Sequence, residues 1–390
     1  MRINALYVII KLVERCNLKC SYCYYYTPEN AEVYQRPTLM PDACLDDLIG
    51  YVQQALLQAP VRRVVFGFHG GEPTLAKAAK VRSFCTAARE RLQPHVDVDF
   101  TLQTNGVHLS EDWLQLISEQ GMGVGISIDG DRALHDRYRI DHQDRGSYDR
   151  VCANLHKLQS LDPAHPIRLT ALAVMGEGFE GLAHYRHLVE DLGIRRIKFL
   201  FVDNTADSPL AKSELEKLSQ ELCEVFDHWL LHDRNRVRVT LFDTAVRGLL
   251  ASHYDRRGTR DRVTMGFALL SDGRIRIQDD FMIASDWFWS QTELNVRTSA
   301  FTDYLHQPHL QQLLHELSHV PKACQDCRFA ESCAGGEPAH RYSRDRSFDN
   351  RSVYCEALYR FYSHVEARLG AGSRILSERN ELPAMTTSAA

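Results

Sequence analysis

The sequence predicts an α/β fold for residues 5–205, because six short runs rich in β-branched and aromatic residues alternate there with helical patterns. The runs are LYVIIKLV, VRRVVFGFH, VDVDFTLQT, MGVGISID, IRLTALAVM and RRIKFLF. Strands separated by helices are expected to be parallel and joined by right-handed crossovers. Two architectures fit, a doubly wound sheet and an incomplete α/β barrel, and periodicity alone does not choose between them.

The helices between these strands follow a period of 3.6 residues. In the first, aliphatic residues from Leu45 to Leu56 fall on one face, and Pro41 and Asp42 mark its start. Similar patterns predict helices over 75–92, 110–120, 146–160 and 179–192.

After residue 205 the pattern changes. Residues 209–232 predict one long bridging helix, and MGFALLSDGRIRIQDD predicts a hairpin that turns at Asp272–Gly273. A helix is expected near 301–317, and the end of the chain is expected to be disordered. We therefore expect four segments: 1–205, 206–255, 256–368 and a disordered tail over 369–390.

Composition excludes several classes of protein. The formal net charge of −5 over 390 residues gives no general attraction to nucleic acid or to membranes. The apolar start is interrupted by Lys11 and lacks a cleavage site, and no run approaches the ~18 apolar residues of a membrane span. We expect a cytoplasmic protein, whose 11 cysteines are ligands or core thiols rather than disulfides. Cys44, Cys85, Cys152 and Cys223, scattered within predicted helices, are expected to be core thiols.

Three cysteines cluster near the N-terminus. Cys16, Cys20 and Cys23 follow the first predicted strand with the spacing C-x3-C-x2-C. Structural zinc usually takes four ligands, so three thiols leave such a site incomplete. A 4Fe–4S cluster held by three thiolates would keep one iron open to another ligand. Chance remains a third explanation of the spacing by itself.

The ends of the next strands favour a binding site at the same edge of the sheet. The second strand ends in HGGEP, where Gly70 and Gly71 let the backbone approach a ligand and Glu72 can pair with an ammonium group. The third ends in TNG and the fourth in SIDG. Sites in α/β folds lie at the carboxyl ends of the strands, where the cysteine loop also lies.

At this point the sequence resembles the radical S-adenosylmethionine (radical SAM) superfamily along nearly its whole length, through the cysteine motif with Tyr22 before its last cysteine and through GGEP. The resemblance implies an incomplete (β/α)6 barrel and a 4Fe–4S cluster whose open iron binds S-adenosylmethionine. It also implies that Tyr22 and Gly71 line the methionine site, that Ser127 and Arg139 hold the carboxylate and ribose side, and that Leu200 packs on the adenine.

Four further cysteines, Cys324, Cys327, Cys333 and Cys355, follow near the C-terminus. Their spacing alone also suits zinc. Beside a radical SAM domain it resembles the SPASM extension, which implies one fully ligated auxiliary 4Fe–4S cluster. The chain departs from the full SPASM pattern, because Gln278 and Glu337 stand where further cysteines are expected. We therefore expect the inner auxiliary cluster to be absent and the chain to hold two clusters.

Within this group the sequence most resembles peptide maturases that form cyclophanes (triceptide-type), through VERCNLKCSYCYYYTPE, RPTLMP and DGRIRIQDDF. This resemblance implies an enzyme that generates a 5′-deoxyadenosyl radical and removes hydrogen from a ribosomally made precursor peptide bearing a leader. It then joins an aromatic ring carbon to a side-chain β-carbon, with a one-electron reductant as a further partner.

Other functions stay open. The first is a sulfatase-type maturase that oxidises Ser or Cys to formylglycine, and the second is a maturase that forms thioethers or epimerises residues. An iron–sulfur electron carrier without a substrate is the non-enzyme alternative. Asp279 occupies the position at which the sulfatase-maturing branch carries a proton-accepting aspartate, with Asp280 next to it. We expect Asp279 to be the catalytic base.

Overall fold

A computed structural model has the predicted mixed α/β architecture, built on one ten-stranded sheet with the order β10-β9-β8-β1-β2-β3-β4-β5-β6-β7. The structure describes all residues except 1, 94, 162–166, 254–261 and 381–390. Strand pairs from β8 through β1 to β7 are parallel, whereas β9 pairs antiparallel with β8 and β10 pairs antiparallel with β9. The strands are β1 (Arg2–Val13), β2 (Val61–Gly70), β3 (Asp97–Thr104), β4 (Gly123–Ser127), β5 (Leu169–Met175), β6 (Arg196–Phe201), β7 (Arg238–Val239), β8 (Arg262–Leu269), β9 (Arg274–Arg276) and β10 (Leu294–Asn295).

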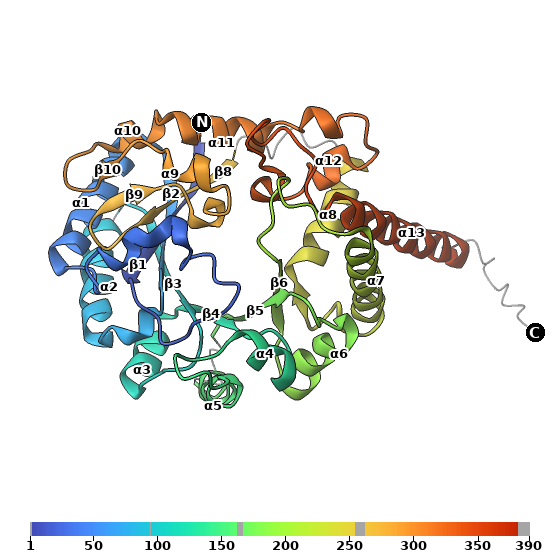
Figure 1. Cartoon of the computed structure of the whole chain (residues 1–390), viewed down its shortest axis with the longest axis horizontal. Helices are drawn as coiled ribbons and strands as arrows, with labels where there is room; N and C mark the ends of the chain where they lie inside the picture. The colour runs from blue at the N-terminus through green and yellow to red at the C-terminus, as the bar shows by residue number, and fades with distance from the viewer. Residues whose placement is uncertain (1, 94, 162–166, 254–261, 381–390) are drawn as a thin grey trace, which may run out of the picture.

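The six strands predicted before residue 205 are confirmed as β1–β6, and the helices between them lie along the outside of an arc of strands (Figure 1). These helices are α1 (Asp42–Gln58), α2 (Ala78–Leu92), α3 (Glu111–Gln120), α4 (Arg132–Tyr138), α5 (Tyr148–Gln159) and α6 (Gly181–Arg186), which continues as a π-turn over His187–Asp191. The local signals are visible at α3, where the Ser110 side chain accepts from the Trp113 N–H and Gly121 ends the helix with φ +58°. Helix α4 was not expected.

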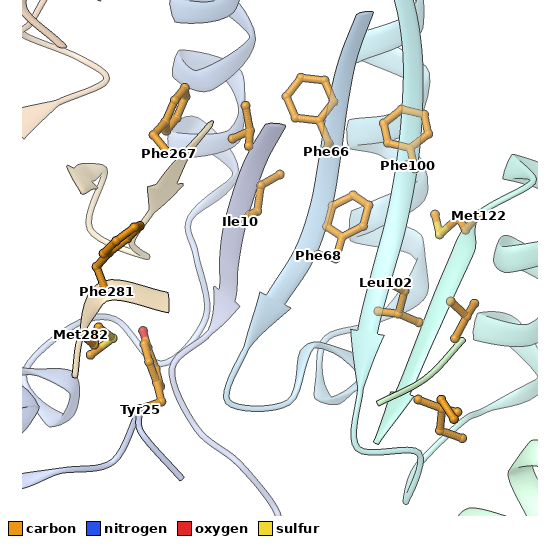
Figure 2. Packing of buried hydrophobic residues seen from close by; sticks show 14 of the residues in the cluster. Ile10, Tyr25, Phe66, Phe68, Phe100, Leu102, Met122, Phe267, Phe281 and Met282 are labelled. Atoms are coloured by element: carbon orange, nitrogen blue, oxygen red, sulfur yellow. The ribbon is translucent and has the colours of Figure 1, made fainter. Parts of the chain in front are cut away.

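Aromatic packing joins the sheet to its outer helices. Phe66 and Phe68 of β2 stack on Phe100 of β3, with ring centroids 6.0 and 6.3 Å apart, as Figure 2 shows. Phe84 of α2 meets the two β2 rings edge-on. Such offset and edge-to-face pairs add to the stabilisation from apolar burial. The apolar core therefore lies between the strands and the outer helices, which leaves the inner face of the arc for polar groups.

The C-terminal part of the chain continues the sheet instead of standing apart from it. Strand β8 pairs in parallel with β1, with Leu269 opposite Ile10, so the sheet crosses the expected boundary at residue 256. The expected hairpin is confirmed as β8 and β9, and Gly273 has φ +88° in its turn. The remaining helices are α7 (Lys212–His228, continued by a π-turn over Trp229–Asp233), α8 (Thr240–His253), α9 (Ser285–Trp289), α10 (Phe301–Leu305), α11 (Pro308–Ser318), α12 (Ala330–Cys333) and α13 (Cys355–Asn380).

Two expectations for this part need correction. The single helix over 301–317 is two helices, because Pro308 lacks an N–H and begins a new helix. The chain is helical as far as Asn380, where disorder was expected from residue 369, since no proline interrupts the helix-forming residues after Cys355. The rest of the expected tail lies outside the described residues. None of the described helices is long and apolar enough to cross a membrane.

A buried carboxylate at the end of β1 joins three segments. Glu14 is 0% exposed and accepts from Arg36 Nε at 3.2 Å, from the Tyr25 hydroxyl at 2.6 Å and from the Ser271 N–H at 3.2 Å. Ser271 belongs to the β8–β9 turn, so one side chain ties the N-terminal loop to the C-terminal hairpin.

We predict that Glu14→Gln lowers the free energy of unfolding by about 3–5 kcal/mol, because it leaves the guanidinium of Arg36 buried without a counter-charge. Denaturant unfolding of the cofactor-free chain measures the change. Glu32→Gln is the matched control, since Glu32 pairs with Arg274 of the same hairpin at 54% exposure and is expected to contribute about 0–1 kcal/mol. Equal losses in the two variants would contradict the role of Glu14.

Candidate active site

One cavity of about 960 Å³ lies on the inner face of the strands and is lined by both halves of the chain. Its walls include the loop after β1, the ends of β2–β4 and β6, the segment after β9 and residues 337–340. Most of the residues predicted to bind cofactors meet there, namely Cys16, Cys20, Tyr22, Cys23, Gly70, Gly71, Ser127, Arg139 and Leu200, together with Asp279.

The cysteine loop is held in place by backbone hydrogen bonds. The Lys19 N–H donates to the Ile140 carbonyl at 2.9 Å and the Ser21 N–H to the Tyr138 carbonyl at 3.1 Å. Cys16, Cys20 and Cys23 are all half-buried against the cavity. Burial, reinforced by the Glu72 carboxylate, raises the pKa of Cys16 to about 12.

The end of β2 passes the cysteine loop so closely that only glycine fits. Gly70 has φ +137°, and a Cβ on Gly71 would overlap the Tyr26 hydroxyl and the Arg15 carbonyl. Glu72, which the sequence suggested would face a ligand, is not among the residues that line the cavity.

The carboxylate of Glu72 is fully buried and joins the loops after β2 and β3. It accepts from the N–H and hydroxyl of Thr74 at 3.1 and 2.6 Å, from the Thr104 hydroxyl at 2.8 Å and from the Asn105 N–H at 2.7 Å. Three of these donors bond to Oε1 and one to Oε2, and the expected contact of Glu72 with an ammonium group stays a prediction.

Beside the cysteine loop, Tyr22 and Arg139 converge on Asp129, a residue that sequence reasoning missed. The Tyr22 hydroxyl donates to Asp129 Oδ2 at 2.5 Å, and Arg139 Nε lies 3.0 Å from the same oxygen. The guanidinium also lies 5.2 Å from the Tyr22 ring centroid. Burial alone would lower the pKa of Arg139, but the Asp129 carboxylate raises it above its ordinary value. This arrangement presents a fixed cation to the cavity.

A second charged group, centred on Lys11, occupies the wall formed by β1, β2 and the segment after β9. Lys11 is fully buried, forms an ion pair with Asp279 and lies 3.2 Å from His69 Nδ1. The Tyr24 hydroxyl donates to Asp279 Oδ2 at 2.5 Å. Burial alone would raise the pKa of Asp279, but the Lys11 ammonium holds it below its ordinary value. Asp279 is therefore a carboxylate throughout the physiological range.

Three further acidic side chains face the cavity near Asp279. Asp280 and Asp203, which follows β6, are exposed within the cavity, where the enclosing protein raises the pKa of each to about 6; repulsion from Asp279 adds to the effect at Asp280. Glu337 lies 3.5 Å from His340 Nε2, and both line the cavity with Lys198 of β6. The position of Asp203 just after a strand was the sequence signal for that residue.

The C-terminal cysteines form a separate group. Cys324 ends the 3-10 turn over Lys322–Cys324, and Cys327 follows it. Cys333 ends α12 and Cys355 begins α13. None of the four lines the cavity. Burial and the neighbouring Cys355 raise the pKa of Cys333 to about 11, and burial followed by Cys324 raises that of Cys355. These mutual effects require the sulfurs to lie near one another. Across the described ranges, no three Cys, His, Asp or Glu side chains converge as ligands of one metal ion would.

The scattered cysteines fit the expectation of core thiols. Cys44 and Cys85 are buried on α1 and α2, and Cys152 and Cys223 are half-buried on α5 and α7. None of these four lines the cavity described above.

Comparisons with known proteins agree with this site. Residues 10–179 match the Radical SAM superfamily. The chain is 23% identical to the serine-type anaerobic sulfatase-maturating enzyme of Bacteroides thetaiotaomicron, over 92% of this chain and 89% of that protein. It is 27% identical to the corresponding enzyme of Klebsiella pneumoniae, over 93% and 87%. The solved structure of native anSMEcpe with bound AdoMet superimposes with a TM-score of 0.78 at 21% identity, covering 95% of this chain and 100% of that one. The chain is therefore similar over most of its length to anaerobic sulfatase-maturating enzymes, and its residues 10–179 resemble the Radical SAM superfamily.

Proposed function

We propose that this chain is a radical SAM maturase that oxidises a residue of a ribosomally made peptide and closes an intramolecular cross-link. The observation that carries the proposal is the cavity lined both by the cysteine loop and by the buried Asp279, whose pKa the Lys11 ammonium holds below its ordinary value. We also propose that β1–β6 act as an incomplete (β/α)6 barrel and that residues 256–368 form a SPASM-like domain. The solved structures of anSMEcpe with AdoMet and a peptide support a peptide as substrate.

The donor groups of the cavity fit the cofactors that the superfamily implies, a 4Fe–4S cluster and S-adenosylmethionine. Three half-buried thiols face one space, and each would bind a different iron, so they need not converge on one point. When bound, the cluster and S-adenosylmethionine supply a 5′-deoxyadenosyl radical that removes hydrogen from carbon. A cavity of about 960 Å³ is at the upper end of the usual range for ligand sites and leaves room for a peptide segment.

In this proposal the chain's own residues orient S-adenosylmethionine. Arg139 and Ser127 bind its carboxylate and ribose side, and the aliphatic side chain of Leu200 on β6 packs against the adenine. Tyr22 and Gly71, which both line the cavity, form the methionine end of the site. Glu72 acts indirectly, by holding the loops after β2 and β3 together.

The four C-terminal cysteines hold one auxiliary 4Fe–4S cluster in this proposal. Full cysteine ligation suits electron transfer, and the electron released when the cross-link forms needs an acceptor. The positions of the missing inner-cluster cysteines are taken by Gln278 and Glu337, both of which line the cavity. Polar side chains there extend the space available to substrate.

Cross-linking of an aromatic ring releases a ring proton, and Asp279 is placed to accept it. Lys11 and Tyr24 keep its carboxylate ionised and oriented, while burial shields it from water. Formylglycine formation from Ser or Cys is the second candidate, favoured by the similarity to sulfatase-maturating enzymes along 92% of the chain.

We predict that anaerobic reconstitution gives about eight irons per chain, from two four-iron clusters. Changing Cys16, Cys20 and Cys23 to Ala should leave about four and abolish formation of 5′-deoxyadenosine. Iron analysis and chromatography of the nucleoside measure both outcomes. About twelve irons would show an inner cluster that we exclude, and about four irons with bound zinc would favour structural zinc at the C-terminal cysteines. Persistent nucleoside formation by the triple variant would contradict the assignment of the loop.

The two candidate products can be separated by their chemistry. We predict that a short peptide encoded beside this chain's reading frame loses two hydrogens and resists fragmentation between the joined residues in tandem mass spectrometry. Oxidation of Ser to formylglycine also removes two hydrogens, so the mass alone does not decide. Trapping with a hydrazide reagent does, because formylglycine is an aldehyde and a cyclophane is not. A sulfatase-derived Ser or Cys peptide that becomes hydrazide-reactive would favour the second candidate.

We predict that Asp279→Asn is less stable than the parent, because Lys11 loses its counter-charge, and that the folded variant still cleaves S-adenosylmethionine and removes hydrogen from substrate but loses cross-linked product by about 10²-fold or more. Asp280→Asn is the matched neighbour and should keep most of the product.

The pH profile provides an independent check. Lys11 and Tyr24 hold the pKa of Asp279 low. A base of this kind stays ionised, and product formation is therefore retained, as the pH falls from 7 to about 5. A base with the pKa of about 6 found for Asp280 would lose activity over the same interval. Loss of product in Asp280→Asn alone would transfer the role to Asp280, and normal product from both variants would exclude both carboxylates.

A further inference from the structure

Arg341 is a buried arginine whose charge is poorly compensated by the protein. Its side chain is 1% exposed, and its two hydrogen bonds, from Nη1 to the Ala334 carbonyl and from Nη2 to the Glu316 carbonyl, are both 3.4 Å long. The Glu316 carboxylate lies 3.8 Å from Nη2. Within the described part of the chain, Nε has no hydrogen-bond partner. A buried guanidinium normally has short bonds to a carboxylate, because removing the charge from water costs several kcal/mol.

The same side chain lies beside the C-terminal cysteines. Ala334 directly follows Cys333, and a Cβ on Gly335 would be 3.1 Å from Arg341 Nη1. The main influence on the pKa of Arg341 is burial, which lowers it, while Glu316, Cys324, Asp349 and Cys333 act in the opposite direction. The buried cation therefore lies against the segment that follows Cys333.

We propose that Arg341 is the charge-compensating residue of the auxiliary cluster and raises its reduction potential. This inference rests on the proposed function, in which Cys324, Cys327, Cys333 and Cys355 hold that cluster. A four-thiolate cluster is anionic and gains one more negative charge when it is reduced by one electron. A fixed buried cation whose Nε–H has no partner among the described residues favours the more negative form, since net charge and hydrogen bonds to sulfur set such potentials.

The direction of this effect fits the use of the cluster as an electron acceptor. A higher potential makes the oxidised cluster a better acceptor for the electron that leaves the substrate radical. The exposed Arg351 provides a contrast, since it is also near Cys324 and Cys355 but its Nε already donates to the Ala323 carbonyl at 2.9 Å. Water and salt screen an exposed charge, so Arg351 should influence the potential little.

The test is a redox titration followed by EPR, on the reconstituted full chain in which Cys16, Cys20 and Cys23 are Ala, so that one cluster contributes. Arg341→Met removes the charge and keeps a long side chain, and Arg341→Lys keeps the charge. We expect Arg341→Met to lower the equilibrium constant for reduction of the cluster at least tenfold. For one electron this corresponds to a reduction potential about 59 mV lower. Arg341→Lys should stay closer to the parent than to the Met variant, and Arg351→Met should stay near the parent.

Loss of iron from Arg341→Met with retention in Arg341→Lys would also support the proposal, because the charge would then be needed to hold the anionic cluster. An unchanged potential in Arg341→Met would overturn it. So would a Lys variant that matches the Met variant in potential or in loss of iron, since shape rather than charge would then matter.

Failure of the proposed function gives a different result. If changing all four C-terminal cysteines to Ala leaves the iron content of the otherwise native chain unchanged, the auxiliary cluster itself is absent. If the iron content of that variant falls by about four per chain but Arg341→Met leaves the reduction potential unchanged, the cluster exists and only the role of Arg341 is wrong.

Discussion

The ion pair between Lys11 and Asp279 is the interaction on which the site depends. Lys11 lies in the central strand β1 with no exposed surface, and an unpaired charge there would cost several kcal/mol. Its partner comes from 268 residues later in the chain, directly after the hairpin that adds β8 and β9 to the sheet. The pair therefore fixes the C-terminal segment against β1 and places a carboxylate in the cavity that the cysteine loop also lines. Neither half of the chain forms this cavity alone.

Other charged side chains near the cavity and near the C-terminal cysteines differ in how closely an opposite charge lies beside them. Glu14 and Arg36 compensate each other, as do Asp129 and Arg139, so these pairs position loops at the edge of the cavity. Asp280 and Asp203 are exposed within the cavity, and the surrounding protein raises their pKa values, with repulsion from Asp279 adding to the effect at Asp280. Arg341 lies beside the segment of the C-terminal cysteines and, in the described part of the chain, has only long hydrogen bonds. The site thus contains charges that a short ion pair fixes and charges without such a partner among the described residues.

Local sequence patterns predicted the strands β1–β6, most of the helices between them and the cysteine loop, because periodicity and capping act within a few residues. They did not predict the pairing of β8 with β1, which is long-range, or the two-residue strand β7. Lys11 was seen only as an interruption of an apolar run, since its partner is remote in sequence. Asp129 within SIDG and the inward turn of Glu72 were missed for a related reason, because hydrogen bonds between neighbouring loops decide them.

The central claim is that the loop bearing Cys16, Cys20 and Cys23 presents an open iron to S-adenosylmethionine inside this cavity. The most direct measurement is the magnetic coupling, by pulsed EPR, between the reduced chain and S-adenosylmethionine carrying an isotopically labelled amino nitrogen. The account predicts a coupling from direct bonding of that nitrogen to iron, which disappears when the three loop cysteines are Ala although the C-terminal cluster remains. Absence of this coupling when the chain is saturated with S-adenosylmethionine would contradict direct bonding to the iron of the loop. So would a coupling that persists after the three cysteines are changed to Ala.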